Sequence, residues 1–402
     1  MWKRFLLIVQ TIFTKKIIFE NPNRYEIVIF DNISLGDLEN LISKYNFFVL
    51  PNRIAEINEI YFSLKMFVRL IKNYRGNVMT AYLVSLLEII KPKIVITNIH
   101  NSLKFFDVAK ILEDKMIFIA IQNGAQYEIK KYKHLYKIKK NDSDLSKNIY
   151  IPHFFCYGQF EVDQHKQENI QVKNFYKVGS LNMANFFYHI KKNKLTLEKN
   201  LYDIGLVSDP LATGNDEQFN LNSLEKGFAT TIKYTVKFCM KNNMKMIFAW
   251  KRDKKKETEA FSDEWNFYKK YLTRDEMEYL LKNSFEKKDR HMSYKSLFQS
   301  KIVVATYSTL LREFLGTGGK ILSCNMTKSD IFDFPLNGIC SIKDCTFDEF
   351  EKQLLNILNM SHNDYFEKLG KDKNYLMEYE KNNSSIEIIK NKLDILLKDK
   401  II

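Results

Sequence analysis

The chain has 402 residues, of which 45% are apolar and 27% charged, a composition typical of globular rather than disordered proteins. This length exceeds one ordinary core, so we expect two domains, and the scarcity of Gly (13) and Pro (6) argues against a loop-rich all-β fold. The net charge of +14 is spread along the chain without a nucleic-acid-binding signature, so we expect no nucleic acid partner.

The first sixteen residues, MWKRFLLIVQTIFTKK, contain an apolar run that Gln10 and Thr11 interrupt. The run is too short to span a bilayer, and no small-residue cleavage site of a signal peptide follows it. With basic residues on both sides, this segment could lie on an anionic membrane, although packing on its own domain is the favoured interpretation. We therefore expect a cytoplasmic protein, with contact at the inner face of the cytoplasmic membrane left open.

The first half alternates apolar runs with helical patterns. Strands are predicted at 25–31, 46–51, 91–98, 116–124, 153–158 and 175–180, and helices at 56–72, 78–90 and 103–113. Strands alternating with helices predict βαβ units and a mostly parallel sheet.

A polar segment at 190–200 is the predicted linker, after which the pattern restarts. The second half has predicted strands at 202–209, 244–250, 301–308 and 319–325, and helices at 221–242, 348–359 and 384–398. The predicted fold class is therefore α/β, with two Rossmann-like halves facing each other across a cleft. The five cysteines form no CxxC pair and are expected to be free thiols in a reducing compartment.

The strongest local signal follows the strand at 301–308, where Tyr307, Ser308 and Thr309 lead into a helix. Free backbone N–H groups and the helix dipole favour phosphate or carboxylate at such a position. Glu313 lies four residues after Thr309 on the same helical face, where its carboxylate could accept the two hydroxyls of a ribose. The alternative that these residues only cap the helix stays open.

Two cations, Lys251 and Arg252, come directly after the strand at 244–250. Arg can bind a phosphate bidentately and Lys can place a point charge beside it. The lysines that follow them, at 254–256, are interpreted as a solvated turn.

The ends of the first-half strands carry polar side chains. His100 and Asn101 follow one strand, and the unperturbed pKa of a histidine side chain suits a general base near neutral pH. The next strand ends in amide side chains and a glycine that suit sugar hydroxyls or simply form a turn, namely Gln122, Asn123, Gly124 and Gln126.

Three further strand ends carry candidate residues. Asp31 and Asp209 each follow an apolar strand and are alternative carboxylate catalysts, although Asp also caps helices frequently. Gly179 and Ser180 form a turn that could contribute to the donor site. No phosphate-loop motif, GxSxG elbow or HExxH motif is present, so we expect a metal-independent site without a cofactor.

Several motifs in chain order resemble a family of bacterial surface-carbohydrate biosynthesis proteins, namely TNIHN (97–101), IQNGAQ (121–126), KVGSLN (177–182), YSTLLREFLGTGGKIL (307–322) and FPLNGICSIKDCTFDEFEKQLLNIL (334–358). That family comprises predicted GT-B glycosyltransferases of O-antigen and capsule gene clusters. The layout is similar, more distantly, to retaining Kdo transferases and to the glycerophosphate polymerases of wall teichoic acid. The chain differs from the family's usual motifs at Gln126, at the pair His100-Asn101 and at the pair Lys251-Arg252.

The resemblance implies an acceptor-binding domain at 1–190, a nucleotide-sugar-binding domain at 191–383 and a helix at 384–402 that crosses back. It implies transfer of a sugar from a nucleotide-activated donor, with CMP-activated Kdo or a nonulosonic acid as one donor, to a glycan or lipid-linked acceptor of the bacterial surface. The alternatives are a UDP-sugar 2-epimerase, a polyol-phosphate transferase and a non-catalytic carbohydrate-binding module.

Overall fold

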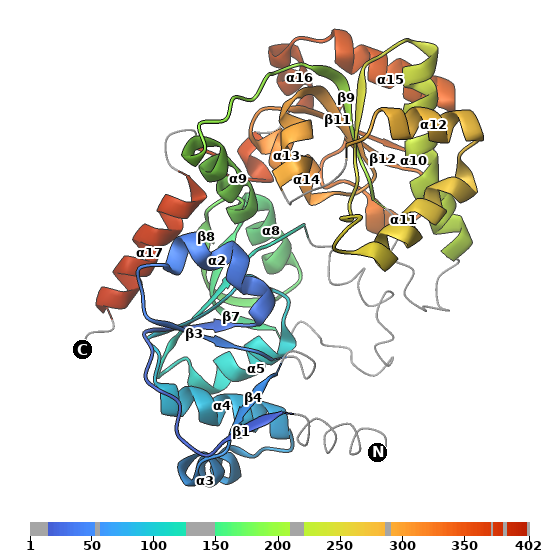
Figure 1. Cartoon of the computed structure of the whole chain (residues 1–402). Helices are drawn as coiled ribbons and strands as arrows, with labels where there is room; N and C mark the ends of the chain where they lie inside the picture. The colour runs from blue at the N-terminus through green and yellow to red at the C-terminus, as the bar shows by residue number, and fades with distance from the viewer. Residues whose placement is uncertain are drawn as a thin grey trace.

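The computed structural model describes residues 15–52, 57–125, 149–209, 221–285, 291–370, 373–380 and 384–399. The chain forms two lobes, each built on a parallel β-sheet with helices around it (Figure 1). This arrangement confirms the predicted α/β class with two mostly parallel sheets.

The first-half sheet has six strands in the order β3-β2-β5-β6-β7-β8, and every neighbouring pair is parallel. The strands are β2 (Ile27–Phe30), β3 (Phe47–Leu50), β5 (Ile94–Thr97), β6 (Ile117–Ile121), β7 (Tyr150–Cys156) and β8 (Gln171–Lys177). Strands β2, β5 and β6 are buried along their whole length, which explains why they form continuous apolar runs in the sequence.

Helices cover both faces of this sheet. One apolar cluster joins it to α2 (Leu35–Ile42), α9 (Leu181–Lys192) and α17 (Ser385–Asp399). A second cluster joins its other face to α4 (Val78–Ile90), α5 (Leu103–Leu112) and α8 (Gln159–Gln167). A short 3-10 helix, η1 (Asn32–Ser34), follows β2.

The second-half sheet has the order β10-β9-β11-β12-β13 and is also parallel throughout. Its strands are β9 (Tyr202–Val207), β10 (Met246–Ala249), β11 (Ser300–Ala305), β12 (Lys320–Asn325) and β13 (Ser341–Lys343). The helices of this half are α10 (Leu221–Lys241), α11 (Thr258–Tyr271), α12 (Arg274–Lys282), α13 (His291–Phe298), α14 (Thr309–Gly316), α15 (Phe347–Asn359) and α16 (His362–Leu369), with a 3-10 turn η3 (Asp330–Phe332). All five cysteines are free, and four of them are buried.

The window 56–72, predicted as one helix, divides into a strand and a shorter helix. Strand β4 (Glu59–Tyr61) pairs in parallel with β1 (Lys16–Ile18), and α3 (Leu64–Asn73) begins only after Ser63. The Ser63 hydroxyl accepts the Met66 N–H at 3.1 Å and so caps the helix. Apolar spacing cannot separate a three-residue strand from a helical turn, which is why the prediction merged them.

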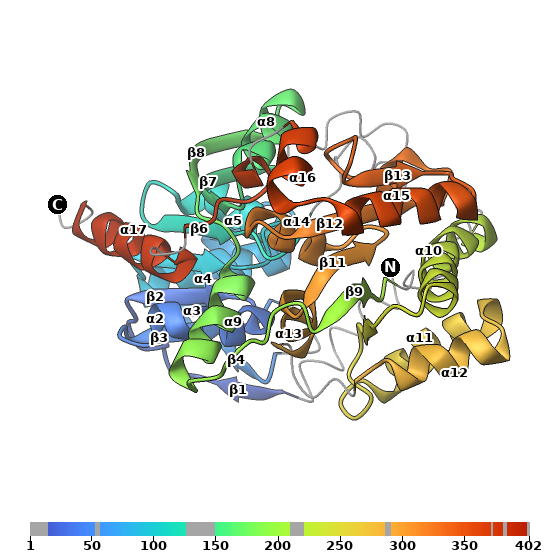
Figure 2. The same cartoon turned by 90° about the horizontal axis from the view of Figure 1, so that it is seen from above.

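The chain returns from the second half to the first through residues 373–380, which begin with η4 (Lys373–Tyr375). The Glu378 N–H donates to the Tyr157 carbonyl at 2.7 Å. Gly179 has φ +74°, and a Cβ on it would lie 2.3 Å from the Glu378 carbonyl oxygen, so a side chain is excluded there. Helix α17 then lies on α2 and α9 of the first half (Figure 2).

Helix α14 of the second half makes buried polar contacts with the first half. The Arg312 guanidinium donates to the Glu161 carboxylate of α8 at 2.7 Å, and both side chains are almost fully buried. Gln122 donates to the same Glu161 oxygen at 3.0 Å, and the Arg312 guanidinium lies over the Phe160 ring. The two halves are thus joined by a buried ion pair with amide and aromatic partners.

Glu313, the next residue of α14, also contacts the first half. Its carboxylate accepts the Ser180 hydroxyl, at the start of α9, and the Tyr294 hydroxyl at 3.0 Å. The side chain is 1% exposed, and burial raises its pKa to about 7 while the two hydroxyl donors lower it. Tyr294 also belongs to a small buried apolar cluster with Tyr157 and Phe186, so this carboxylate lies next to apolar side chains.

We predict that Arg312→Met destabilises the protein, because it leaves the Glu161 carboxylate buried without a cation. Breaking a buried ion pair in this way costs about 3–5 kcal/mol. Burial already raises the pKa of Glu161, and the Arg312 cation opposes that rise, so the variant should lose less stability at pH 5 than at pH 8. Thermal unfolding midpoints at the two pH values measure the effect.

The double variant Glu161→Gln/Arg312→Met buries no charge at this position and is the matched control. It should recover most of the midpoint lost at pH 8. An Arg312→Met protein as stable as the wild type at pH 8 would show that the pair does not hold the halves together.

A second prediction concerns Glu313. Its folded-state pKa lies above the ordinary value of 4.5, so the folded protein holds this proton more tightly than the unfolded chain. The resulting stabilisation, about 3 kcal/mol, is complete below pH 4.5 and is lost as the pH rises through 7. Glu313→Gln keeps a neutral hydrogen-bonding side chain, so we expect its unfolding midpoint to match the wild type near pH 4.5 and to exceed it at pH 8. Parallel midpoints of the two proteins across this range would contradict the assignment.

Candidate functional site

The carboxyl ends of three adjacent second-half strands bring the predicted donor residues to one edge of the sheet. Asp209 lies two residues after β9, Lys251 and Arg252 follow β10, and Ser308 follows β11. Because β10, β9 and β11 are neighbours and parallel, these residues meet at the edge where α/β folds bind ligands.

Asp209 is one of two carboxylates at this edge. It accepts the Tyr307 N–H at 3.1 Å, which links the ends of β9 and β11. Burial raises the pKa of Asp209 to about 7, the Lys251 cation and the Tyr307 N–H lower it, and the nearby Glu264 carboxylate raises it. A carboxylate with this pKa can exchange a proton near neutral pH.

The exit of β10 is held by a buried carboxylate. Glu264 of α11 accepts the backbone N–H groups of Lys251 and Arg252, each at 3.0 Å, and also the Ser208 hydroxyl. The backbone of the two cations is therefore fixed, while the Lys251 side chain is exposed. The Arg252 guanidinium donates to Glu257 at 2.9 Å in an ion pair that is partly exposed.

Helix α14 begins directly beyond β11. The Ser308 hydroxyl accepts the Leu310 N–H at 3.4 Å, which is the capping interaction expected of a serine at this position. The Tyr307 side chain contacts Arg312 instead, and its hydroxyl accepts a hydrogen bond from the Arg312 guanidinium at 3.2 Å. The capping interpretation of Ser308 therefore describes this structure, and the N-terminal dipole of α14 still points toward the Asp209 edge.

The amides at the end of β6 are placed by buried contacts. Gln122 is 1% exposed, accepts the Tyr157 N–H at 2.8 Å and donates to the Gly124 carbonyl and to Glu161, each at 3.0 Å. Gln122 thus ties the turn at 122–125 to α8 and to the buried ion pair. Its hydrogen-bonding groups are occupied by protein in this structure.

His100 and Asn123 lie together at the same edge of the first-half sheet. The Asn123 N–H donates to His100 Nδ1 at 3.4 Å, and the His100 ring stacks on Phe154 at a centroid distance of 5.8 Å. The Asn123 carbonyl accepts from the Asn182 side chain at 3.2 Å, and Asn123 itself is exposed. Asn101 is exposed in the turn before α5.

The first-half turn and the second-half helix start touch each other at Thr309. The Thr309 hydroxyl accepts the Ala125 N–H at 2.8 Å, and a Cβ on Gly124 would lie 3.2 Å from the same oxygen. The turn predicted to bind an acceptor is therefore in direct contact with the helix start predicted to bind a nucleotide. Gln126, also predicted for this patch, lies outside the described residues.

Other predicted site residues have different partners. Asp31 is buried, and its carboxylate accepts the Ile33 N–H at 2.9 Å as the cap of η1. Gly179 lies against the crossing segment, and Ser180 binds Glu313. Glu313 does share a face with Thr309, as its spacing predicts, but the two hydroxyls that it accepts belong to Ser180 and Tyr294 rather than to a ribose.

Sequence reasoning missed three residues that organise this region, namely Glu161, Glu264 and Arg312. The signal for Arg312 was available, since adjacent opposite charges in the apolar segment LLREFL have no polar helix face to occupy. Glu161 and Glu264 lie in polar helical segments, where nothing in the sequence separates a buried carboxylate from an exposed one.

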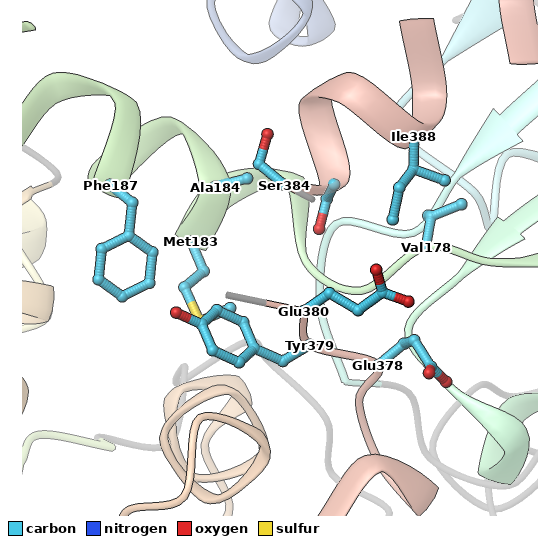
Figure 3. A pocket seen from close by; sticks show the side chains of 10 residues that line it. Val178, Met183, Ala184, Phe187, Glu378, Tyr379, Glu380, Ser384 and Ile388 are labelled. Carbon is cyan, nitrogen blue, oxygen red and sulfur yellow. The ribbon is translucent and has the colours of Figure 1, made fainter. Parts of the chain in front are cut away.

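A cavity of about 170 Å³ lies away from this edge, between α9, the crossing segment and the start of α17. Met183 and Phe187 of α9 form one wall, and Glu378 and Glu380 lie on the crossing-segment side (Figure 3). None of the predicted site residues lines it. Within the described ranges, no group of three or more His, Cys, Asp or Glu side chains could hold a metal ion, and no helix has the length and apolar character needed to span a membrane.

The fold is similar to that of several solved enzymes. A UDP-bound structure of S. aureus MnaA is 11% identical, with a TM-score of 0.52 over 96% of this chain and 97% of that one. The UDP-GlcNAc 2-epimerase of Methanocaldococcus jannaschii, solved with UDP-GlcNAc and UDP, is 11% identical, with a TM-score of 0.50 over 92% and 99%. The wall teichoic acid polymerase TagF is 9% identical, with a TM-score of 0.50 over 94% and 90%.

By sequence, neither a protein-family profile nor a curated protein matches this chain. At these identities the structural likeness establishes the fold, which is the two-domain GT-B arrangement shared by nucleotide-sugar epimerases and GT-B transferases.

Proposed function

We propose that this chain is a metal-independent glycosyltransferase that uses a nucleotide-activated sugar and an acceptor of the bacterial surface. The observation that carries the proposal is the junction at Thr309, where the turn after β6 meets the start of α14 beside the Asp209 edge. A donor at the helix start and an acceptor along the 122–125 turn would lie next to each other there.

The cationic groups at this edge suit the departing nucleotide phosphate. Lys251, Arg252 and the N-terminus of α14 supply positive charge where negative charge develops in the transition state, so no metal ion is needed for that role. Glu264 fixes the backbone of both cations, which keeps them at the strand end. Nucleoside diphosphates and CMP-activated keto-sugar acids such as Kdo both carry the phosphate that this site would bind.

Two side chains are candidates for the base that deprotonates the acceptor hydroxyl. Asp209 has a pKa of about 7 and lies at the donor edge. His100 is held on the acceptor side by the Asn123 N–H. Asp31 is the weaker candidate, because its carboxylate caps η1.

Epimerisation of a UDP-sugar is the second candidate function, favoured by the similarity to the M. jannaschii epimerase. The similarity to TagF likewise keeps transfer of a polyol phosphate among the candidates. The first-half edge favours transfer, since the exposed group on its turn is the Asn123 amide, and amides suit the binding of the hydroxyls of an acceptor sugar. An epimerase has no acceptor to bind there.

We predict that one nucleotide among UDP, CDP, CMP, GDP and TDP raises the thermal unfolding midpoint of the protein. At about 100 times its dissociation constant, a ligand stabilises the folded state by roughly 2.7 kcal/mol. The double variant Lys251→Ala/Ser308→Ala should lose this shift. Lys254→Ala, which removes an exposed lysine of the same loop, should retain it. The absence of a shift with all five nucleotides would favour a non-catalytic binding module.

The products then separate the candidate activities. The substrate for this assay is a sugar linked to the nucleotide that raises the unfolding midpoint. A transferase releases free nucleotide in proportion to added acceptor, whereas an epimerase changes the sugar configuration without any acceptor. We expect acceptor-dependent release, measured by chromatography of the nucleotides. Asp209→Asn or His100→Gln should reduce it by about 10²–10⁴-fold, depending on which is the base, while the thermal shift with nucleotide persists. Acceptor-independent epimerisation would overturn the transferase proposal.

A further inference from the structure

Helix α3 has the apolar spacing of a helix with one hydrophobic face. Leu64, Phe67, Val68 and Ile71 occur at positions i, i+3, i+4 and i+7, which places them on one side of the helix. In an ordinary surface helix this side packs on the core. In α3 it faces solvent, with Leu64 80%, Val68 58% and Ile71 62% exposed.

The opposite, narrower side of α3 is the one that packs on the protein. Met66 is fully buried, and α3 contacts α4. Asn73 donates to Ser85 and Glu88 of α4 at 3.1 Å. The exposed apolar side is therefore fixed in place by polar and apolar contacts on the other side.

Neighbouring segments extend the apolar area. Phe62 is exposed and its ring contacts that of Phe67, at a centroid distance of 5.9 Å. The Phe62 N–H donates to the Ile18 carbonyl at 2.7 Å, which brings exposed Phe19 beside it. We call the exposed apolar residues of this region the α3 surface, namely Phe19, Phe62, Leu64, Phe67, Val68, Ile71, Tyr74 and Val78.

The charges along α3 are positive. Residues 60–87 contain four Lys or Arg and no Asp or Glu. Two acidic residues lie at the edge of the α3 surface, namely Glu20, which is exposed beside Phe19, and Glu59, which pairs with Lys16 at 3.0 Å. Arg69 is neutralised by Glu88 at 2.5 Å, whereas Lys65, Lys72 and Arg75 are exposed. An apolar face bordered by cations complements a surface that is apolar inside and anionic outside.

We propose that the α3 surface binds an anionic lipid bilayer, with its apolar side chains in the acyl boundary and its cations at the lipid headgroups. Aromatic residues such as Tyr74 suit the same interface. The surface lies at the end of the first lobe remote from the second lobe (Figure 1), so a bound membrane leaves the Thr309 junction uncovered. This proposal is independent of the proposed catalytic activity.

The test is flotation of the full-length protein with vesicles of neutral phosphatidylcholine alone or with 30% anionic phosphatidylglycerol. We expect binding to the anionic vesicles that weakens in high salt and is at least about tenfold weaker on neutral ones. Each exposed cation contributes about fivefold to binding at an anionic surface. Lys65→Gln/Lys72→Gln should therefore reduce the affinity by at least tenfold.

The matched control variants substitute exposed apolar residues or exposed lysines that lie outside the α3 surface. Leu64→Ser/Ile71→Ser should reduce vesicle binding at least tenfold, whereas Leu195→Ser/Ile395→Ser, at exposed apolar positions away from α3, should not. Lys269→Gln/Lys282→Gln is the charge control, since both lysines are exposed on the second half. Unchanged thermal midpoints confirm that each variant is folded.

Two results would overturn the proposal. Vesicle binding by Leu64→Ser/Ile71→Ser at the wild-type affinity would assign membrane contact to another segment, such as residues 1–14. A wild-type dimer that Leu64→Ser/Ile71→Ser converts to a monomer, without any vesicle binding by the wild type, would make the α3 surface an interface between two copies of this chain. Sedimentation velocity without lipid measures that outcome.

Discussion

The buried ion pair between Glu161 and Arg312 is the interaction on which the arrangement of the two halves depends. A buried guanidinium is unfavourable without a carboxylate, and here the carboxylate belongs to the other half of the chain. Separating the lobes would therefore leave both the Glu161 carboxylate and the Arg312 guanidinium without their partner. The pair also sets the rotation of α14 about its axis, because Arg312 and Glu313 are adjacent and must both reach first-half partners.

That constraint reaches the candidate site through the same helix. Thr309 at the start of α14 meets the Ala125 N–H, Arg312 meets Glu161, and Glu313 meets Ser180. A helix held at three points along one side cannot shift alone when an anion binds at its N-terminus. Any movement of α14 would have to carry the 122–125 turn and the start of α9 with it, so the donor and acceptor sides are mechanically coupled.

The sequence predicted the structure correctly where the residues of one segment are enough to indicate whether it is buried. Strands β2, β5 and β6 are buried on both faces, so their apolar runs identified them, and parallel topology then required Asp209, Lys251 and Ser308 to meet at one edge. It was uninformative where the environment comes from distant residues. The positions of Glu161 and Arg312 differ by 151, and nothing local shows that their charges cancel. The same limit applies to Glu313, whose two hydroxyl donors come from different halves.

Helices α14 and α3 depart from the usual distribution of polar and apolar residues in opposite directions. In α14, adjacent charges are buried because the other half supplies partners for them. In α3, a complete apolar face is exposed because no element of the described chain covers it. Local sequence patterns specify what environment a side chain requires, but not which surface provides it. For α14 that surface is within the molecule. For α3, the cations around the apolar face favour an anionic lipid surface, because lipid headgroups supply counter-charges and a protein core does not.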